Sequence, residues 1–414
     1  MNRAWNHHRI VASVVVLLLV GKIAPLFADS ALRWVQVVAP GQSIQAAIDQ
    51  AASGGWVYVL PGTYRETAST TNGLSISRSV HLVGLSTARK KVVLKNSGTQ
   101  RNGIVAVPAA HTNCLSCHAA LAPPFALLPG VPDAPSVEPA VRNVAISGIT
   151  IEDFTNNGLF TRNVDGFAIV DVHAVGNKNY GIFPTRSTNG VILRSSATGA
   201  DDSGIWIETS TNITAAQNVV TGNVVGLEVS NSDNVLLTRN EASGNSVGMA
   251  MMFLPDAFDE FPDLRRIAIR GNHLHDNNKV NTARAGSPLA TVPAGMGIFL
   301  LGADDSLIAG NVIENHGFVG IGVADYCLVM AGGPFDCATD PRLTEEFLLD
   351  SPASGNRVVG NRLRGNGTAP GPANPFAFAA SDLGLMTVDD HGNCFQANVF
   401  ATLFSTLGIL PACQ

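Results

Sequence analysis

Residues 203–252 read SGIWIETSTNITAAQNVVTGNVVGLEVSNSDNVLLTRNEASGNSVGMAMM, and this stretch decides the fold. A glycine followed by an aliphatic residue recurs in it after 22 residues, and NVVTGN at 218–223 returns as NEASGN at 240–245. The glycine signature continues in both directions with successive steps of 23, 23, 22, 22, 49 and 23 residues. Its members are Gly158, Gly181, Gly204, Gly226, Gly248, Gly297 and Gly320. A fixed period of this length indicates a repeat architecture.

Short alternating apolar triplets, with Asn at corners and Gly at turns, suit coils of three short strands each. We therefore predict an all-β fold, a single-stranded right-handed parallel β-helix. A leucine-rich repeat has a similar period, but its ladder of leucines is absent. Because side chains alternate along a strand, the residue after each glycine should stack inward and the next should point outward. The 49-residue step is interpreted as two coils and a small insertion.

Residues 43–53, SIQAAIDQAAS, are expected to form a helix that caps the open end of the stack. The apolar residues share one helical face, Ser43 can N-cap, and Gly54 and Gly55 can end the helix. Further insertions into the stack are expected near residues 108–139, 253–263 and 325–354.

Composition and net charge limit the class of protein and its partners. The 414 residues are 46% hydrophobic and 14% charged, against roughly 25% charged for an average domain, which excludes a disordered or coiled-coil protein. The net charge of −6, without a run of Lys or Arg, argues against nucleic acid as the main partner.

The first 28 residues have the pattern of a signal peptide, with two arginines, an apolar run over residues 10–20 and small residues near the end. Lys22 and Pro25 interrupt the run, which makes a spanning helix the weaker interpretation. We expect residues 29–414 to form one secreted or periplasmic β-helix domain, with no membrane span after signal cleavage.

Six cysteines are expected to form disulfides in that compartment. Sequence does not determine their connectivity, but neighbours along the chain are the favoured partners. The neighbouring pairs are Cys114 with Cys117, Cys327 with Cys337, and Cys394 with Cys413.

Residues 38–67, VAPGQSIQAAIDQAASGGWVYVLPGTYRET, resemble the opening of pectin-lyase-like right-handed β-helix proteins. Residues 226–256 and 292–317 are similar to a family of exported bacterial parallel β-helix repeat proteins, which has no settled activity. The broader fold includes pectate lyases, polygalacturonases, alginate epimerases and a periplasmic maturation protein for nitrous oxide reductase. This resemblance implies the fold and does not choose an activity.

An aromatic strip is predicted on the outer face of the Gly-led strands. Phe160, Phe183 and Trp206 occupy equivalent outward positions, followed by Glu228, and neighbouring coils lie about 4.8 Å apart. Sugars stack on such surfaces, so these residues are candidates for binding an extracellular or envelope polysaccharide. In the alternative interpretation, an apolar loop covers the strip, and AALAPPFALLPGVP at residues 119–132 is a candidate for that loop.

Ionisable residues near the strip suggest lyase or epimerase chemistry on a uronate-type glycan. Clustered carboxylates would bind calcium and neutralise the uronate, and a base would abstract the C5 proton. The candidate calcium ligands are Asp201 and Asp202, and the candidate catalytic residues are Glu208, Arg162, Arg186 and Lys178. The GHG and RIK motifs of polygalacturonases and the DPH motif of alginate epimerases are absent. The sequence ADDS occurs at residues 200–203 and again at 303–306, so a polar corner is the competing interpretation.

The sharpest local motif is CLSCH at residues 114–118, inside the insertion at about 108–139. Cys-x-x-Cys-His is the attachment signature of c-type haem, with His118 as axial ligand. A disulfide between Cys114 and Cys117, or a zinc or copper site, are the alternatives. The leading hypothesis is therefore glycan binding, with cleavage or epimerisation as its catalytic form. A non-catalytic scaffold with an envelope protein partner and a haem or metal protein remain open.

Overall fold

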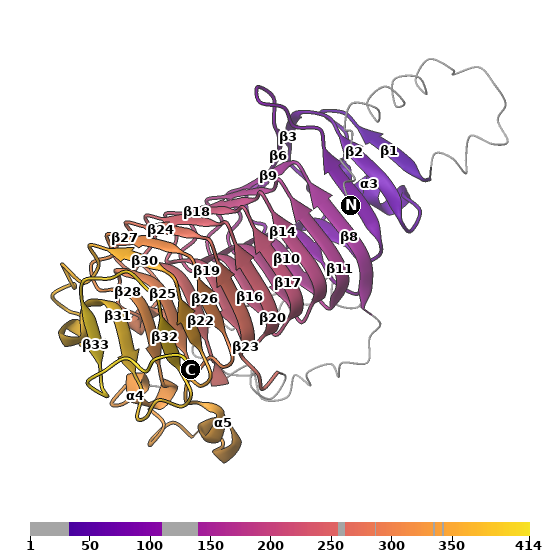
Figure 1. The fold of residues 1–414 in the computed structure, drawn as a ribbon. Helices are drawn as coiled ribbons and strands as arrows, with labels where there is room; N and C mark the ends of the chain where they lie inside the picture. Colours follow the sequence, from indigo (N-terminus) through magenta and orange to yellow (C-terminus); the bar gives the residue numbers. More distant parts are fainter. Residues whose placement is uncertain (1–32, 110–139, 256–260, 286, 334–335, 342) are drawn as a thin grey trace, which may run out of the picture.

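A computed structural model describes residues 33–109, 140–255, 261–285, 287–333, 336–341 and 343–414. These residues form an elongated stack of coils, with a helix at one end and two more beside the other (Figure 1). Each coil adds one strand to each of three parallel sheets, here called A, B and C, which contain 12, 10 and 11 strands in the described residues. The predicted all-β, right-handed parallel β-helix is confirmed.

Successive strands pass from sheet C to sheet A to sheet B and back to sheet C. Sheet A contains β1 (Val35–Val38), β2 (Gly55–Val59), β5 (Val80–Gly84), β8 (Val141–Ser147), β11 (Val164–Val170), β14 (Thr188–Leu193), β17 (Thr211–Ala216), β20 (Asp233–Thr238), β23 (Arg265–Arg270), β26 (Leu307–Ala309), β29 (Arg357–Val359) and β32 (Cys394–Gln396). Sheet B contains β3 (Gly62–Tyr64), β6 (Val92–Lys95), β9 (Ile149–Glu152), β12 (His173–Val175), β15 (Ser196–Thr198), β18 (Val219–Thr221), β21 (Glu241–Ser243), β24 (His273–His275), β27 (Val312–Glu314) and β30 (Arg362–Arg364). Sheet C contains β4 (Asn72–Ile76), β7 (Asn102–Ala106), β10 (Asn157–Arg162), β13 (Tyr180–Thr185), β16 (Ser203–Glu208), β19 (Val225–Ser230), β22 (Val247–Met252), β25 (Met296–Leu301), β28 (Val319–Ala324), β31 (Ser381–Met386) and β33 (Leu403–Ser405).

The repeated glycine begins the sheet C strands because coils approach closely there. A Cβ at Gly181 would lie 2.4 Å from the carbonyl oxygen of Gly204, and one at Gly226 would lie 2.6 Å from that of Gly248. No real side chain tolerates such distances, so the period read from the sequence reflects backbone packing. The residues after these glycines point inward as predicted, and all of them are fully buried: Leu159, Ile182, Ile205, Leu227, Met249, Ile298 and Ile321.

Two ladders of buried side chains satisfy the backbone at the coil corners. The ladder between sheets A and B has amide contacts of 2.9–3.1 Å and contains Asn218, Asn240, Asn272, Asn311, Asn361 and Asn398. The ladder between sheets B and C has contacts of 2.8–3.1 Å and contains Asn223, Asn245, Asn277, His316, Asn366 and Asp382. Each amide oxygen also accepts a backbone N–H from the preceding coil, as at Asn240, which pairs turn groups that would otherwise be buried unpaired.

The capping helix α3 (Ile44–Gln50) covers the N-terminal end, and the Ser43 hydroxyl accepts the Ala46 N–H as expected of an N-cap. The helix is shorter than the predicted 43–53. It ends at Gln50, because the backbone of Ala51 is extended, and the Arg78 guanidinium donates to the carbonyls of Asp49 and Ala51 at this end.

The interpretation of the 49-residue step as two coils is wrong. Between Gly248 and Gly297 the chain forms one coil, since a single strand joins each sheet: β23 in sheet A, β24 in sheet B and β25 in sheet C. The extra length lies in two insertions, one before β23 and one over residues 276–295 that includes η3 (Pro288–Thr291). The second insertion has no counterpart in the sequence predictions.

The remaining helices are α4 (Tyr326–Met330) and α5 (Glu345–Asp350), inside the expected insertion at 325–354, and η4 (Ala377–Ala379). Two of the predicted local disulfides are confirmed, Cys327–Cys337 and Cys394–Cys413, with Cα–Cα separations of 5.4 and 4.8 Å. Within the described residues, no helix has the length and apolarity needed to cross a membrane.

Candidate functional site

The aromatic strip on sheet C forms in the predicted register. Phe160 pairs with Phe183 across β10 and β13, with ring centroids 5.3 Å apart. The rings of Phe183 and Trp206 stack at 4.4 Å with planes 7° apart. Tyr180 joins the strip, 4.8 Å from both of these rings.

The strip is buried, as in the covered interpretation, and does not form an open platform. Phe160, Phe183 and Trp206 are 1%, 2% and 6% exposed, and they pack with Val105 and Val107. A glycan cannot lie directly on rings with so little exposed surface. The structure therefore agrees with a covered strip, while the loop at 119–132 that was expected to cover it lies outside the described residues.

Beside the strip, two carboxyl groups share one serine. Ser203 Oγ lies 3.2 Å from Asp202 Oδ1 and is also hydrogen-bonded to Glu228 Oε2. The Tyr180 hydroxyl donates to the other Asp202 oxygen at 3.3 Å, and Ser230 Oγ donates to Glu228 Oε1 at 3.2 Å. A serine hydroxyl has one proton, so it can donate to only one of its two carboxyl neighbours. A proton on one carboxyl group supplies the missing donor.

Burial explains why one of these carboxyl groups keeps its proton near neutral pH. Loss of hydration raises the pKa of Asp202 to about 7 and that of Glu228 to about 8, and the negative charges of Asp202 and Glu208 raise the pKa of Glu228 further. Glu228 is only 2% exposed. The pair thus holds protons near neutral pH, as groups that act as general acids must.

A second polar group lies at the carboxyl ends of the same strands. Thr185 Oγ1 donates to Glu208 Oε2 at 2.7 Å and receives a hydrogen bond from Thr209 Oγ1 at 2.9 Å. Thr209 Oγ1 also accepts the backbone N–H of Arg186 at 3.0 Å. Arg162 precedes Thr185 in the same outward column, so it stands two coils from Glu208. The structure brings three of the four predicted catalytic residues to one strand edge, where their side chains are half-buried.

The fourth, Lys178, lies at the opposite strand edge and forms an ion pair with Asp201 at 3.6 Å. Asp201 and Asp202 therefore point to different partners, one to a lysine and the other to Tyr180 and Ser203. Among the described residues, no group of three His, Cys, Asp or Glu side chains could hold a metal ion. Calcium binding by Asp201 and Asp202 stays a prediction.

The second ADDS sequence is a polar corner, as the competing interpretation expected. Asp304 Oδ1 accepts hydrogen bonds from the backbone N–H of Ser354 at 2.8 Å and from its hydroxyl at 2.7 Å. Asp304 thus joins two coils. The first copy differs because Tyr180 and Glu228 surround Asp202.

Sequence reasoning missed Tyr180 and Ser203. Both begin sheet C strands one residue before the repeated glycine, a position from which no function was expected. A comparison between coils could have found them, because the equivalent residues of the following coils, Val225 and Val247, are apolar, whereas Tyr180 and Ser203 carry hydroxyl groups. The residues of the CLSCH motif, Cys114, Cys117 and His118, and the signal peptide at 1–28 lie outside the described residues.

Comparison with known families identifies the group. A model of NosD, described as a periplasmic copper-binding protein, matches residues 142–371, which is more than half of the chain. The chain belongs to the NosD family. The matched range contains every strand that carries the site, from β10 to β19, and the NosD family is a periplasmic one.

Solved structures agree with the fold. The A-module of mannuronan C-5 epimerase AlgE6 from Azotobacter vinelandii is 17% identical, with a TM-score of 0.58 over 90% of this chain and 93% of that one. A tailspike protein of E. coli bacteriophage HK620 is 11% identical, with a TM-score of 0.55 over 86% of this chain and 57% of that one. At this identity the likeness concerns the fold alone. No curated protein matches the sequence significantly.

Proposed function

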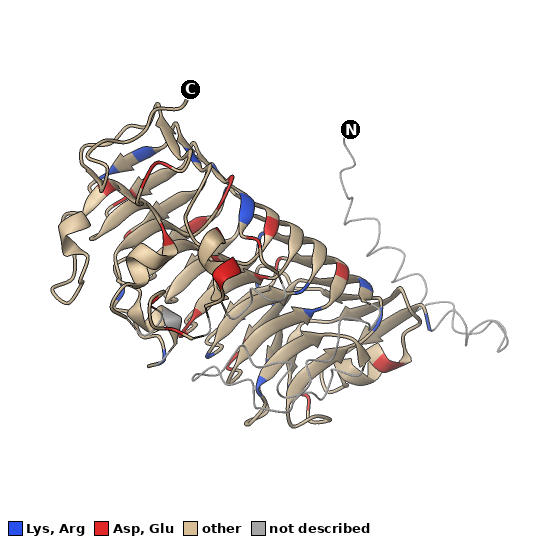
Figure 2. Cartoon of the chain, turned by 90° about the horizontal axis from the view of Figure 1, so that it is seen from below, with Lys and Arg blue, Asp and Glu red and all other residues tan. Residues whose placement is uncertain are grey.

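We propose that this NosD-family protein binds an acidic polysaccharide in the periplasm, on the outer face of sheet C from β10 to β19. One observation carries the proposal. Ionisable and hydroxyl side chains occupy this face in four consecutive coils, whereas the next three strands of the sheet, β22, β25 and β28, carry only apolar residues. Figure 2 shows that charged residues are sparse and scattered along the stack.

The charge balance of the face suits a uronate. With Asp202 and Glu228 protonated, the basic side chains Arg162, Arg186 and Lys178 outnumber the acidic side chains Glu208 and Asp201, and Lys279 also interacts with Asp201. Half-buried arginines bind carboxylates through paired hydrogen bonds. Because the aromatic rings are buried, the glycan contacts would fall on these charged groups at the strand edges.

Cleavage or epimerisation is the catalytic form of the proposal. Both reactions need a group that takes the C5 proton and a second group that returns or supplies one. Glu208, Arg162 and Arg186, which lie together at one strand edge, are the candidate groups for these two proton transfers. If the protein does not catalyse a reaction, the same face would make it a glycan-binding protein or an envelope scaffold.

The proposal is tested by calorimetric titration of the full chain with oligouronates and with neutral oligosaccharides of the same length. Oligouronates should bind, and R162Q or R186Q should weaken binding about tenfold, the loss expected for one charged hydrogen bond. Binding should also weaken between about pH 6 and pH 9, as Asp202 and Glu228 lose their protons. Equal affinity for neutral and acidic sugars would contradict the proposal.

Arg194→Gln provides the matched control. Arg194 follows β14 on sheet A and forms an exposed ion pair with Asp171 at 2.9 Å. Its removal changes net charge as R162Q does, but leaves sheet C intact. If R194Q weakens oligouronate binding as much as R162Q, the effect is one of overall charge and the proposed face is wrong. Unsaturated uronate products or new reducing ends, measured in parallel, report the catalytic form.

Copper binding through Cys114, Cys117 and His118 is a second candidate, which the description of the NosD family favours. Thiolates and imidazole are ligands that copper prefers. Protein expressed in the periplasm should bind copper(I) stoichiometrically, and C114S with C117S should abolish that binding. A haem absorption band in the same preparation would assign the motif to haem instead.

A further inference from the structure

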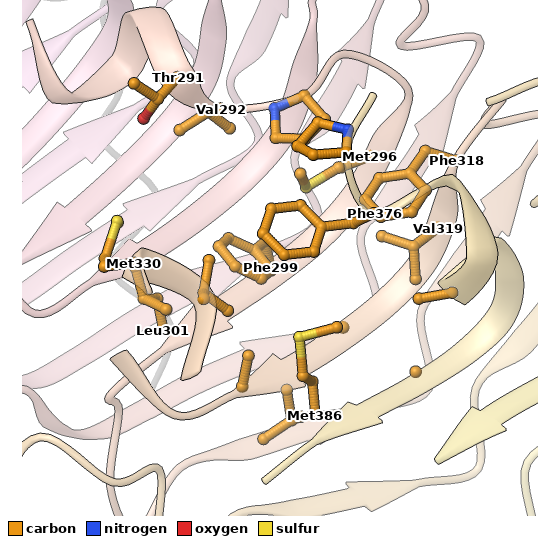
Figure 3. Close-up of a pocket in the computed structure, with 18 of the residues that line it drawn as sticks. Thr291, Val292, Met296, Phe299, Leu301, Phe318, Val319, Met330, Phe376 and Met386 are labelled. Carbon is orange, nitrogen blue, oxygen red and sulfur yellow. The ribbon is translucent and has the colours of Figure 1, made fainter. Parts of the chain in front are cut away.

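The apolar half of sheet C contains a cavity of about 370 Å³ (Figure 3). It lies on the outer face of β25, β28 and β31, and β22 separates these strands from the charged face. Aromatic rings and thioethers dominate its lining, with Phe299, Phe318, Phe376, Met296, Met330 and Met386 around it. Among the described residues that line it, one side chain, Thr291, carries a hydroxyl and none carries a charge.

Two glycines create the floor of the cavity. The outward column of sheet C runs through Phe299, Gly322, Gly384 and Phe404 on consecutive strands. Because two side chains in succession are missing, a gap lies between the flanking rings of Phe299 and Phe404. Neighbouring coils are about 4.8 Å apart, so the gap extends over two coils.

The fold does not require glycine at these two positions. Neither residue has a positive φ. A Cβ at Gly322 would lie 3.3 Å from Phe299 Cδ2, and one at Gly384 would lie 3.4 Å from Val319 Cγ2, whereas the repeated glycines would meet backbone oxygens at 2.4–2.9 Å. Glycine weakens a strand and often marks a place where a ligand approaches. Its effect here is to keep the space open.

The walls of the cavity are anchored. Residues 291–293 form one wall, and the Asn281 amide holds this segment by donating to the carbonyls of Leu289 and Val292 at 2.7 and 2.8 Å. Helix α4 and residues 331–333 form another wall, which the Cys327–Cys337 disulfide ties to the following loop. A pocket held in this way is formed before a ligand arrives, which lowers the entropy lost on binding.

We propose that this cavity is a binding site for an uncharged small molecule that contains an aromatic ring. Its volume falls within the range of ligand pockets. A charged group would lose its hydration there without gaining a partner, which excludes ions and free uronates. Phenylalanine rings and methionine sulfurs both make favourable contacts with an aromatic ring. The inference is independent of the glycan proposal, because it uses none of the residues at that site.

A fluorescence titration of the full chain with N-phenylnaphthylamine, a neutral aromatic probe, tests the proposal. The probe should bind saturably with one site per chain, and anilinonaphthalene sulfonate, its charged analogue, at least about tenfold more weakly. G384L should fill the cavity and weaken binding of the neutral probe by at least about tenfold. G371L is the matched control, since it adds the same side chain where a Cβ at Gly371 has no atom within 4 Å.

A second measurement on the unmodified chain keeps the proposal falsifiable if G384L does not fold. In a spectrum of methionine methyl groups, Met296, Met330 and Met386 should shift on addition of the probe, while the inward-facing Met249 and Met251 should not. No saturable binding, equal binding by G384L and the unmodified chain, or shifts spread equally over all methionines would each overturn the proposal.

Discussion

His316 replaces asparagine in the ladder between sheets B and C. Its Nε2 accepts from the Asn277 amide at 3.0 Å, and its Nδ1 lies 2.9 Å from Asn366 Oδ1. Asn366 Oδ1 is an acceptor, so Nδ1 must carry the proton. A neutral imidazole in this tautomer offers one donor and one acceptor, as an asparagine amide does in the other coils.

This substitution should make the protein sensitive to acid. Burial lowers the pKa of His316 to about 4. A histidine whose pKa is lowered by folding stabilises the fold above its unfolded pKa, near 6.5, and that contribution is lost as pH falls toward the folded pKa. H316N should match the unmodified chain in urea unfolding at about pH 8 and exceed its stability by about 3 kcal/mol near pH 4. Parallel acid profiles of the two chains would show that His316 is not the responsible group.

Glu228 should have the opposite effect on pH dependence. Its pKa is raised in the folded state, so its contribution to stability is complete at pH below the usual glutamate pKa and is lost as pH rises through about 8. E228Q keeps the shape and cannot ionise. Urea midpoints of E228Q should therefore fall less than those of the unmodified chain between about pH 6 and pH 9. An unchanged slope would mean that Glu228 is ionised throughout.

At the scale of the element, glycine has two different roles in sheet C. At the start of each strand it permits backbone contact between coils, as Gly226 does below Gly248. In the outward column it leaves space, as Gly322 does beside Phe299. Sequence alone does not separate these roles, because both glycines lie in strands flanked by apolar residues.

Alanine substitution distinguishes the two roles. G226A should destabilise the fold by about 3 kcal/mol, since the added methyl overlaps a backbone oxygen that cannot move independently. G322A should change stability by less than about 1 kcal/mol, because the nearest atom, Phe299 Cδ2 at 3.3 Å, belongs to a side chain that borders the cavity and needs to shift by only a few tenths of an ångström. Thermal or chemical unfolding of both variants provides the comparison. Equal losses would remove the distinction on which the cavity argument depends.

Elements could be predicted from the sequence where each coil repeats a local rule. The Gly-led strands, the inward columns and the Ser43 cap all follow such rules. The end of α3 could not be predicted, because Arg78, distant in sequence, binds its last carbonyls. The single coil between Gly248 and Gly297 was also missed, since insertions at corners have no period of their own.

At the scale of the whole molecule, stacking places residues of distant repeats on one face. That rule predicted the column of Phe160, Phe183, Trp206 and Glu228, but not its burial, which depends on what packs over the sheet. It also placed Gly322 outward without revealing the cavity, whose walls come from two insertions. Sheet C thus has two halves, one with charged and protonated side chains and one that is apolar, and we propose a different ligand for each.

Hydrogen exchange of the full chain, with and without an oligouronate at about pH 6, tests whether the charged half of sheet C binds an acidic glycan. We expect slower exchange in peptides covering the turns at residues 162–164, 185–188 and 208–211, and no change at the turns between sheets A and B. Protection that is confined to sheet A or sheet B, or absent at saturating oligouronate, would contradict the account.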